Sequence, residues 1–89
     1  PKNKRAYKYQ GDIYYNWKKY DKSLESYNHA IALDDEYIGA YYDRPLVFED
    51  IGEYNNALED YNKILSIDSL HVGAHNRRGI VYHFYLDDF

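Results

Sequence analysis

Apolar and small residues follow one another at helical intervals along this chain, and polar turns interrupt them at regular places. The first stretch, about 4–18, carries Tyr7, Gly11, Tyr14 and Trp17 on one face. The second, about 22–33, carries Leu24, Tyr27, Ala30, Ile31 and Leu33. Asp21 stands where an N-cap is expected between them. The pattern predicts a helical hairpin, which the acidic run 34–36 separates from the next segment.

The following segment has the same plan. Tyr41, Phe48 and Ile51 mark one helix, which Gly52 is placed to end. Asn55 is the expected N-cap of the next helix. That helix carries Leu58, Tyr61, Ile64, Leu65 and Ile67. A fifth helix begins near Val72 and runs toward Phe89. We therefore expect an all-α fold of five antiparallel helices without a long linker.

The two hairpins are related by an internal repeat of 34 residues. Equivalent positions hold Ala6, Ala40 and Ala74; Gly11, Pro45 and Gly79; and Tyr14, Phe48 and Tyr82. A period of this length indicates one supersecondary unit stacked on copies of itself. The sequence predicts a single domain over 1–89 with repeat 1 at about 4–37, repeat 2 at about 38–71 and a partial repeat 3 at about 72–89.

Small and aromatic residues at these positions carry a resemblance to a known family. The first unit supplies Tyr7, Gly11, Tyr14, Tyr20, Ser23, Tyr27 and Ala30. The second supplies Tyr41, Pro45, Phe48, Tyr54, Ala57, Tyr61 and Ile64, and the third supplies His75, Gly79 and Tyr82. This register resembles the tetratricopeptide repeat (TPR) family over nearly the whole chain. The resemblance implies helix hairpins stacked as a right-handed superhelix, with a concave surface that binds peptides.

The net charge of −4 is unevenly distributed along the chain. Residues 1–22 hold seven Lys or Arg against two acids, whereas residues 23–70 hold two against eleven. Phosphate backbones are bound by a continuous basic track. The acidic middle of the chain therefore argues against a nucleic-acid partner.

Other compositional features narrow the class of protein further. The chain has no cysteine, so it has neither a disulfide nor a thiolate ligand. No apolar run is long enough to cross a membrane, and no signal peptide is visible. We expect a cytoplasmic protein without membrane contact. Because the chain starts at Pro1 and has no Met, we also expect a fragment of a longer protein.

The spacing of the serines, acids and histidines indicates neither a catalytic nor a metal-binding site. The serines stand at packing or linker positions, without an accompanying His and Asp. The adjacent acids Asp34–Asp35, Glu59–Asp60 and Asp87–Asp88 are expected to be exposed, since neighbouring side chains diverge. His71 and His75 have the spacing of a zinc pair, but we expect one in a linker and the other at an aromatic packing position. We expect no enzyme activity, metal or cofactor.

The family resemblance places the binding surface on the first helix of each hairpin. The expected groove residues are Arg5, Lys8, Tyr9, Asp12, Tyr15, Tyr42, Asp43, Glu49, Asp50 and Arg77. The charged members would match charges on a peptide, and the tyrosines would supply contact area. We interpret the chain as a non-catalytic protein–protein interaction module, a scaffold or adaptor fragment whose acidic groove suits a peptide with basic residues.

Two other interpretations of the groove stay open. One TPR subfamily grips the terminal carboxylate of Hsp70 or Hsp90 with lysines, asparagines and an arginine. Lys8 and Arg77 match that clamp, but Asp12 and Asp43 replace asparagines and Gly73 replaces a lysine, so the clamp is degraded. Alternatively, the groove is merely solvated, and its two basic side chains only neutralise the acids.

Two departures from the pattern suggest a structural role instead. Pro45 stands inside a predicted helix, where it removes a hydrogen bond and clashes with the carbonyl group of Tyr41. The helix is then kinked, broken into a hinge, or exchanged between chains. The third unit also leaves an apolar face formed by Ile80, Val81, Tyr82 and Tyr85. Both features suggest a homo-oligomer assembled through the open end.

Overall fold

The computed structural model describes residues 3–86, and this part of the chain forms five α-helices and a short π-helical segment. The helices are α1 (Lys4–Asn16), α2 (Tyr20–Leu33), α3 (Ile38–Asp50), α4 (Tyr54–Ile67) and α5 (Val72–Ile80), and the π-helical segment is Val81–Tyr85. The expected all-α architecture of five helices is confirmed. The predicted end of the fifth helix at Phe89, and the pair Asp87–Asp88, lie outside the described residues.

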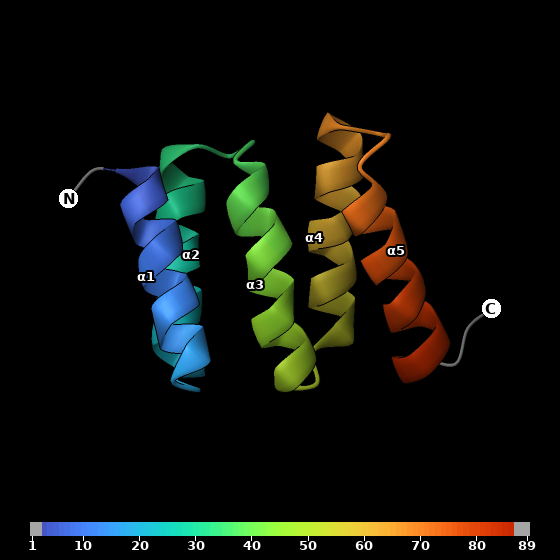
Figure 1. Ribbon diagram of the computed structural model, residues 1–89, viewed down its shortest axis with the longest axis horizontal. Coiled ribbons are helices and arrows are strands. Elements are labelled where there is room, and N and C mark those ends of the chain that lie inside the picture. The colour runs from blue at the N-terminus through green and yellow to red at the C-terminus, as the bar shows by residue number, and fades with distance from the viewer. Residues whose placement is uncertain (1–2, 87–89) are drawn as a thin grey trace.

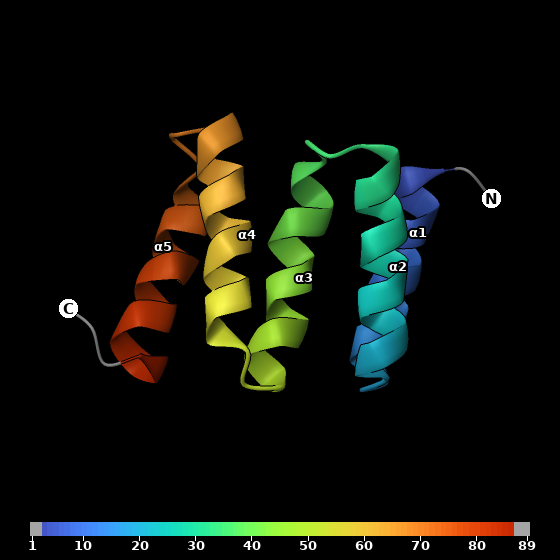
Figure 2. The same ribbon diagram turned by 180° about the vertical axis from the view of Figure 1, so that it is seen from behind.

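The helices follow one another along the long axis of the molecule, with α2 behind α1, and this row of hairpins measures 42 × 27 × 15 Å (Figure 1). Helices α1 and α2 pack as one hairpin, α3 and α4 pack as the next, and α5 packs on α4. Seen from behind, α2 lies in front of α1 (Figure 2). Each repeat therefore contacts mainly its neighbour, as in other stacked repeat proteins.

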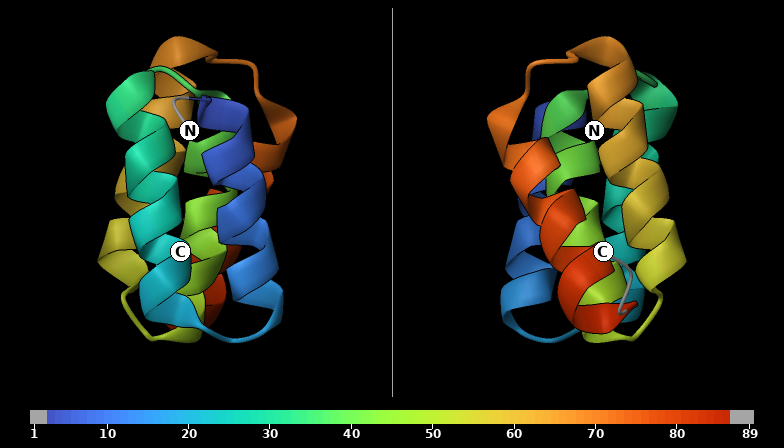
Figure 3. Two further views of the ribbon diagram at one scale, coloured as in Figure 1. Left: turned by 90° about the vertical axis from the view of Figure 1, so that its left-hand side faces the viewer. Right: turned by 90° about the vertical axis from the view of Figure 1, so that its right-hand side faces the viewer.

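The end view shows how the row is layered (Figure 3). Helices α2 and α4 lie along one side, α1 and α5 lie along the other, and α3 lies between them. Helix α3 also contacts α1 directly. The first helices of the three repeats therefore share one surface of the molecule, where the sequence places the groove.

The turns between paired helices come earlier in the chain than the sequence predicts. Helix α1 ends at Asn16, and α2 begins at Tyr20 behind Lys19, whose side chain makes no cap hydrogen bond. Helix α4 likewise begins at Tyr54. The predicted N-caps Asp21 and Asn55 are therefore wrong: both lie inside the first turn, because the chain reverses within three residues and the helix starts at once.

A left-handed residue makes each of these reversals. Lys18 has φ 61° and Gly52 has φ 82°, and the two residues stand at equivalent places in the repeat. Glycine adopts this conformation without steric cost, whereas a residue with a Cβ is strained in it. The prediction that Gly52 terminates the third helix is confirmed.

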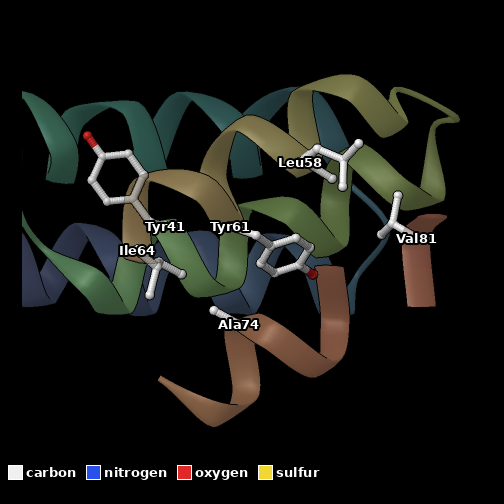
Figure 4. Packing of buried hydrophobic residues seen from close by; sticks show 7 residues of the cluster. Tyr41, Leu58, Tyr61, Ile64, Ala74 and Val81 are labelled. Carbon is white, nitrogen blue, oxygen red and sulfur yellow. The ribbon is translucent and has the colours of Figure 1, made fainter. Parts of the chain in front are cut away.

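The main core lies between α3, α4 and α5 (Figure 4). Its buried residues are Tyr41, Ala57, Leu58, Tyr61, Ile64, Ala74 and Val81. Val81 is completely buried, so the expectation that it is exposed is wrong. Val47, at the equivalent position one repeat earlier, is completely buried as well. Ile80 and Tyr85 are about half exposed.

The π-helical segment carries the end of the described chain back over α4. The ring of Tyr85 stacks on that of Tyr54, with centroids 4.4 Å apart and planes 9° apart. Leu86 and Tyr82 pack against the core. Part of the apolar face predicted for the third repeat is thus covered by the chain itself. Within residues 3–86, no helix is both long and apolar enough to span a membrane.

Pro45 lies inside an unbroken helix. Helix α3 runs without interruption from Ile38 to Asp50, and Pro45 is fully buried. The alternative in which proline breaks this helix into a hinge is therefore wrong. Flanking side chains hold the segment in place, since the Arg44 guanidinium lies 5.7 Å from the Tyr41 ring centroid and 5.4 Å from that of Phe48. Exchange of helices between chains stays a prediction.

Candidate functional site

A cluster of charges joins the first helices of repeats 1 and 2. Lys8 and Asp12 lie one turn apart on α1, and α3 places Asp43 opposite them. Lys8 Nζ is 3.0 Å from Asp12 Oδ2 and 2.9 Å from Asp43 Oδ2. The buried Tyr27 of α2 donates its hydroxyl proton to Asp12 Oδ1 at 2.5 Å. One ammonium group thus bridges two carboxylates, which leaves an excess of one negative charge.

The protonation behaviour of this cluster reflects partial burial. Burial raises the pKa of Asp43 above its ordinary value, and the neighbouring Asp12 raises it further, against the opposing effect of Lys8. Burial alone would lower the pKa of Lys8, but hydrogen bonds and charge attraction from Asp43 and Asp12 raise it. Lys8 therefore stays protonated, and the Asp43 carboxyl group takes up a proton at a higher pH than an ordinary aspartate does.

A pocket of about 310 Å³ opens beside these charges. Its walls come from α1, α2 and α3. They consist of Asp12, Tyr15, Asn16, Tyr27, Asp43 and Leu46. The pocket combines two carboxylates with two aromatic rings and one aliphatic side chain. Such walls suit a long cationic side chain, whose methylene groups pack on the Tyr15 ring and on Leu46 while its charge reaches the acids.

A second group of side chains lies between repeats 2 and 3. Tyr61 of α4 donates its hydroxyl proton to Glu49 Oε2 of α3 at 2.6 Å, although its ring is fully buried. Burial raises the pKa of Tyr61, and the bond to Glu49 raises it further. The guanidinium of Arg77 lies 4.7 Å from the ring centroid of Tyr42, which also contacts His71 at 5.2 Å.

A third group lies where α1 and α3 end and α2 begins. Tyr20 donates its hydroxyl proton to Asp50 Oδ2 at 3.1 Å, and the rings of Tyr15 and Tyr20 are 6.2 Å apart. Burial, followed by a hydrogen bond to Asp50, raises the pKa of Tyr15 to about 12. Tyr15 therefore remains neutral. It hydrogen-bonds to Asp50 in the third group and also lines the pocket beside the first group.

Two of the expected groove residues belong to none of these groups: Arg5 lies away from them, and Tyr9 only borders the first group at Lys8. Arg5 is exposed in the first turn of α1, where only its backbone N–H is held, by Asn3 Oδ1 at 2.9 Å. Tyr9 is 54% exposed, and its ring lies 5.1 Å from Lys8 Nζ. The remaining eight expected residues fall into the three groups. Their assignment to a binding surface stays a prediction.

Sequence reasoning did not find the hydroxyl groups of Tyr27 and Tyr61. Both tyrosines were assigned to packing, and both rings are indeed buried. Their hydroxyls nevertheless hydrogen-bond to Asp12 on α1 and to Glu49 on α3. A signal was available, because each tyrosine recurs at the same repeat position and a buried phenol needs a hydrogen-bond partner.

Asp60 was expected to be exposed, and that expectation is wrong. Its residue is 3% exposed, and Arg44 binds it with both ends of the guanidinium fork: Nε to Oδ2 at 2.9 Å and Nη2 to Oδ1 at 2.6 Å. Arg44 Nη1 also donates to Asn28 Oδ1 at 2.7 Å. Burial raises the pKa of Asp60, while Arg44 lowers it. The ion pair joins the two helices of repeat 2, and the bond to Asn28 ties them to repeat 1.

His71 lies in the linker as expected, whereas His75 differs from expectation. His71 caps α5, because its Nδ1 accepts the N–H of Ala74 at 2.9 Å. His75 is exposed rather than packed, and its Nε2 lies 2.9 Å from the carbonyl oxygen of Ser69. In residues 3–86, no group of three or more His, Asp or Glu side chains could hold a metal ion.

Comparison with known proteins agrees with the repeat architecture. The family description "TPR repeat" matches residues 11–52, and "Tetratricopeptide repeat" matches residues 38–69. The crystal structure of MamA protein superposes with a TM-score of 0.86 at 30% identity, covering 91% of this chain and 44% of that chain. A second crystal structure of MamA gives the same TM-score and identity, with 47% of that chain covered.

A plant structure shows the same fold. The Arabidopsis OM64 TPR domain superposes with a TM-score of 0.84 at 26% identity, covering 94% of this chain and 69% of that chain. The chain spans less than half the length of the two MamA structures. A search of curated proteins found no match. The 34-residue period, the stacked hairpins and these matches together show that the chain belongs to the tetratricopeptide repeat family.

Proposed function

We propose that this TPR chain is a non-catalytic module that binds an extended peptide segment of a partner protein, with a Lys or Arg of that peptide in the pocket beside Asp12 and Asp43. A role in protein–protein interaction follows from the family. The peptide groove, the basic ligand and the scaffold or adaptor role are our proposal. The lack of any catalytic arrangement in the sequence favours a binding function over an enzymatic one.

The observation that carries the proposal is the unbalanced charge at the pocket. Lys8 is shared between two carboxylates, so one negative charge is left without a cationic partner inside the cluster. A ligand cation in the pocket would supply it, and the Tyr15 ring and the Leu46 side chain would contact its stem. A groove that is only solvated would have no reason to build an aromatic pocket at this charge excess.

The carboxylate-clamp alternative has less support. A peptide carboxylate would have to take Lys8 from Asp12 and Asp43, and it would then face both acids. Gly73 offers no side chain for the clamp lysine. Like charges placed together cost several kcal/mol at an interface. The same cluster that attracts a cationic ligand thus repels a carboxylate.

The test measures binding of a fluorescent Lys-rich peptide by anisotropy, with a Glu-rich peptide of equal length as the comparison ligand. We expect selective, salt-sensitive binding of the basic peptide, weakened about tenfold or more by Asp43→Lys, because the ligand then meets a like charge. Asp43→Asn, which keeps the shape, should weaken it less.

Glu59→Lys is the matched control, since it makes the same change of charge at an exposed position on α4 away from the pocket. It should leave the affinity within about twofold of the parent, allowing for long-range charge effects. Equal affinity of the parent and Asp43→Lys would refute the proposed site. Equal weakening by Glu59→Lys and Asp43→Lys would show a nonspecific response to net charge.

A further inference from the structure

A pocket of about 410 Å³ opens where α1 turns into α2, beside the end of α3. We call it the turn pocket, and its walls are Lys18, Lys19, Tyr20, Asp21, Lys22 and Ile51. Half of these side chains are lysines. The pocket described above, which we call the acidic pocket, has Asp12 and Asp43 among its walls instead. The described part of the chain thus carries two pockets of opposite charge.

The corresponding turn of repeat 2 shows that the fold does not require these lysines. A pocket of about 330 Å³ lies there, with walls formed by Gly52, Glu53, Tyr54, Asn55, Asn56 and Leu86. The tyrosine is the same in both repeats, but a glycine, an acid and an amide stand 34 residues after the three lysines. Packing of the turn therefore does not explain why positive charge gathers in repeat 1.

The positive charge of the turn pocket is only partly compensated. Among residues 3–86, no carboxylate forms an ion pair with any of its three lysines, all of which are exposed. Lys22 Nζ lies 5.8 Å from the ring centroid of Tyr14. The acids at the pocket are Asp21 in its wall and Asp50, which accepts the hydroxyl proton of Tyr20 at 3.1 Å. Three cations thus stand against two carboxylates, an excess opposite in sign to that of the Lys8 cluster.

A pair of tyrosines separates the two pockets. Tyr15 lines the acidic pocket and Tyr20 lines the turn pocket, with ring centroids 6.2 Å apart, and both hydrogen-bond to Asp50. On the α3 side, Leu46 lines the acidic pocket and Ile51 lines the turn pocket. Their separation in the chain corresponds to about 7.5 Å of helix. An extended peptide covers that distance in about two to three residues, so one ligand can reach both pockets.

We propose that the peptide whose basic side chain enters the acidic pocket also carries an Asp or Glu about two to four residues away, and that this acid enters the turn pocket. Lys18, Lys19 and Lys22 would surround its carboxylate. The inference rests on the proposed function, because it takes the basic residue beside Asp12 and Asp43 as given. Two pockets of opposite charge select the order of the two residues in the peptide, since an acid on the other side of the basic residue points away from the lysines.

The number of charges favours an acidic side chain over an anionic membrane as the occupant. Lipid headgroups are recognised by clusters of about four to eight basic residues. The turn pocket has three lysines, and Asp21 stands among them. It also offers the Tyr20 ring and Ile51, against which the methylene groups of one Glu side chain can pack.

The test compares labelled peptides by anisotropy. Each peptide carries one Lys and one Glu placed two, three or four residues before or after it, and its partner peptide has Gln in place of Glu. We expect one order and spacing to bind the parent about three- to tenfold tighter than its Gln partner, because the exposed lysines each contribute modestly. Lys19→Glu in the protein should abolish this gain, so that the Glu and Gln peptides then bind alike.

Lys63→Glu is the matched control, since it makes the same change of charge on α4, outside both pockets. It should preserve the gain. A gain that Lys19→Glu leaves intact, or that Lys63→Glu abolishes equally, would overturn the inference. So would binding to phosphatidylserine vesicles that depends on Lys19 without any gain from Glu in the peptides, because the turn pocket would then belong to a membrane contact.

Failure of this inference can be told from failure of the proposed function. If Glu and Gln peptides bind the parent alike in every order and spacing, yet Asp43→Lys weakens both, the acidic pocket stands and the role of the turn pocket is refuted. If no peptide of either kind binds, or if Asp43→Lys changes nothing, the proposed function fails and this inference fails with it.

Discussion

The two complete hairpins join their helices through different chemistry at the same repeat positions. In the first hairpin, Ser26 donates to Gln10 at 3.0 Å, and neither group is charged. In the second, Asp60 accepts two bonds from Arg44. A neutral bond and a buried ion pair thus serve one place in the fold. They should fail very differently, because a buried charge that loses its partner is far more costly than an amide that does.

The largest effect is expected from separating the ion pair. Arg44→Met leaves the buried Asp60 carboxylate uncompensated and should lower the free energy of unfolding by about 3–5 kcal/mol. Gln10→Met, the matched change in the first hairpin, should cost about 1 kcal/mol. Urea denaturation measures both. Replacing both members of the pair, as Arg44→Met with Asp60→Leu, should recover much of the loss; equal costs for the two single changes would contradict the comparison.

An intermediate effect is expected at the small-residue positions. Gly11→Ala places a methyl group against the Tyr27 ring and should destabilise the protein by about 1–3 kcal/mol. Gly79→Ala enters open space and should stabilise it by up to about 1 kcal/mol, because alanine is the better helix former. Thermal unfolding of the two variants decides the matter, and a shift of the same sign in both would show that packing does not distinguish the repeats.

The smallest effect concerns pH. The pKa values of Asp43 and Asp60 are raised by burial, so the folded state holds more protons than the unfolded state above the ordinary value of 3.8. Their contribution to stability is therefore complete below that value and is lost as the pH rises through the raised pKa. Asp43→Asn should flatten the fall of the melting temperature as the pH rises above 3.8.

Asp21→Asn, at an exposed position, serves as the control for that experiment. It should leave the slope of the melting temperature against pH unchanged above pH 3.8. Asp34 acts in the opposite sense, because hydrogen bonding to Lys4 lowers its pKa and its contribution is lost only as the pH falls below 3.8. An identical slope in the parent and in Asp43→Asn would show that Asp43 does not titrate as its surroundings indicate.

The fold could be predicted because its information is periodic and local. Spacing of small and aromatic residues identified the hairpins, and Gly52 identified the end of α3. The starts of α2 and α4 could not be predicted in this way. Lys19 and Glu53 occupy the N-cap positions, and neither caps its helix with a side-chain hydrogen bond. The capping preference that pointed to Asp21 and Asn55 is therefore overridden by the tight turn.

The groove was predicted less completely, because its contacts cross between helices. Lys8 and Asp12 share a helical face, which the sequence shows directly. Their meeting with Asp43 and Tyr27 depends on how three helices stack. Asp60 was misjudged for the same reason: an acid within a polar run looks solvated until a cation from the neighbouring helix is seen to cover it.

The two left-handed turns differ in backbone strain, so we expect the two hairpins to open in a fixed order. Lys18 bears a backbone strain of about 1 kcal/mol that Gly52 does not. The first hairpin is therefore less stable at its turn than the second hairpin, and we expect fraying to begin there. Since units of a stacked repeat contact only their neighbours, α1 can peel away while α3, α4 and α5 keep their packing. Opening of the molecule then proceeds from the basic end inward, and the Lys8 bridge to Asp43 is the first contact between repeats to be released.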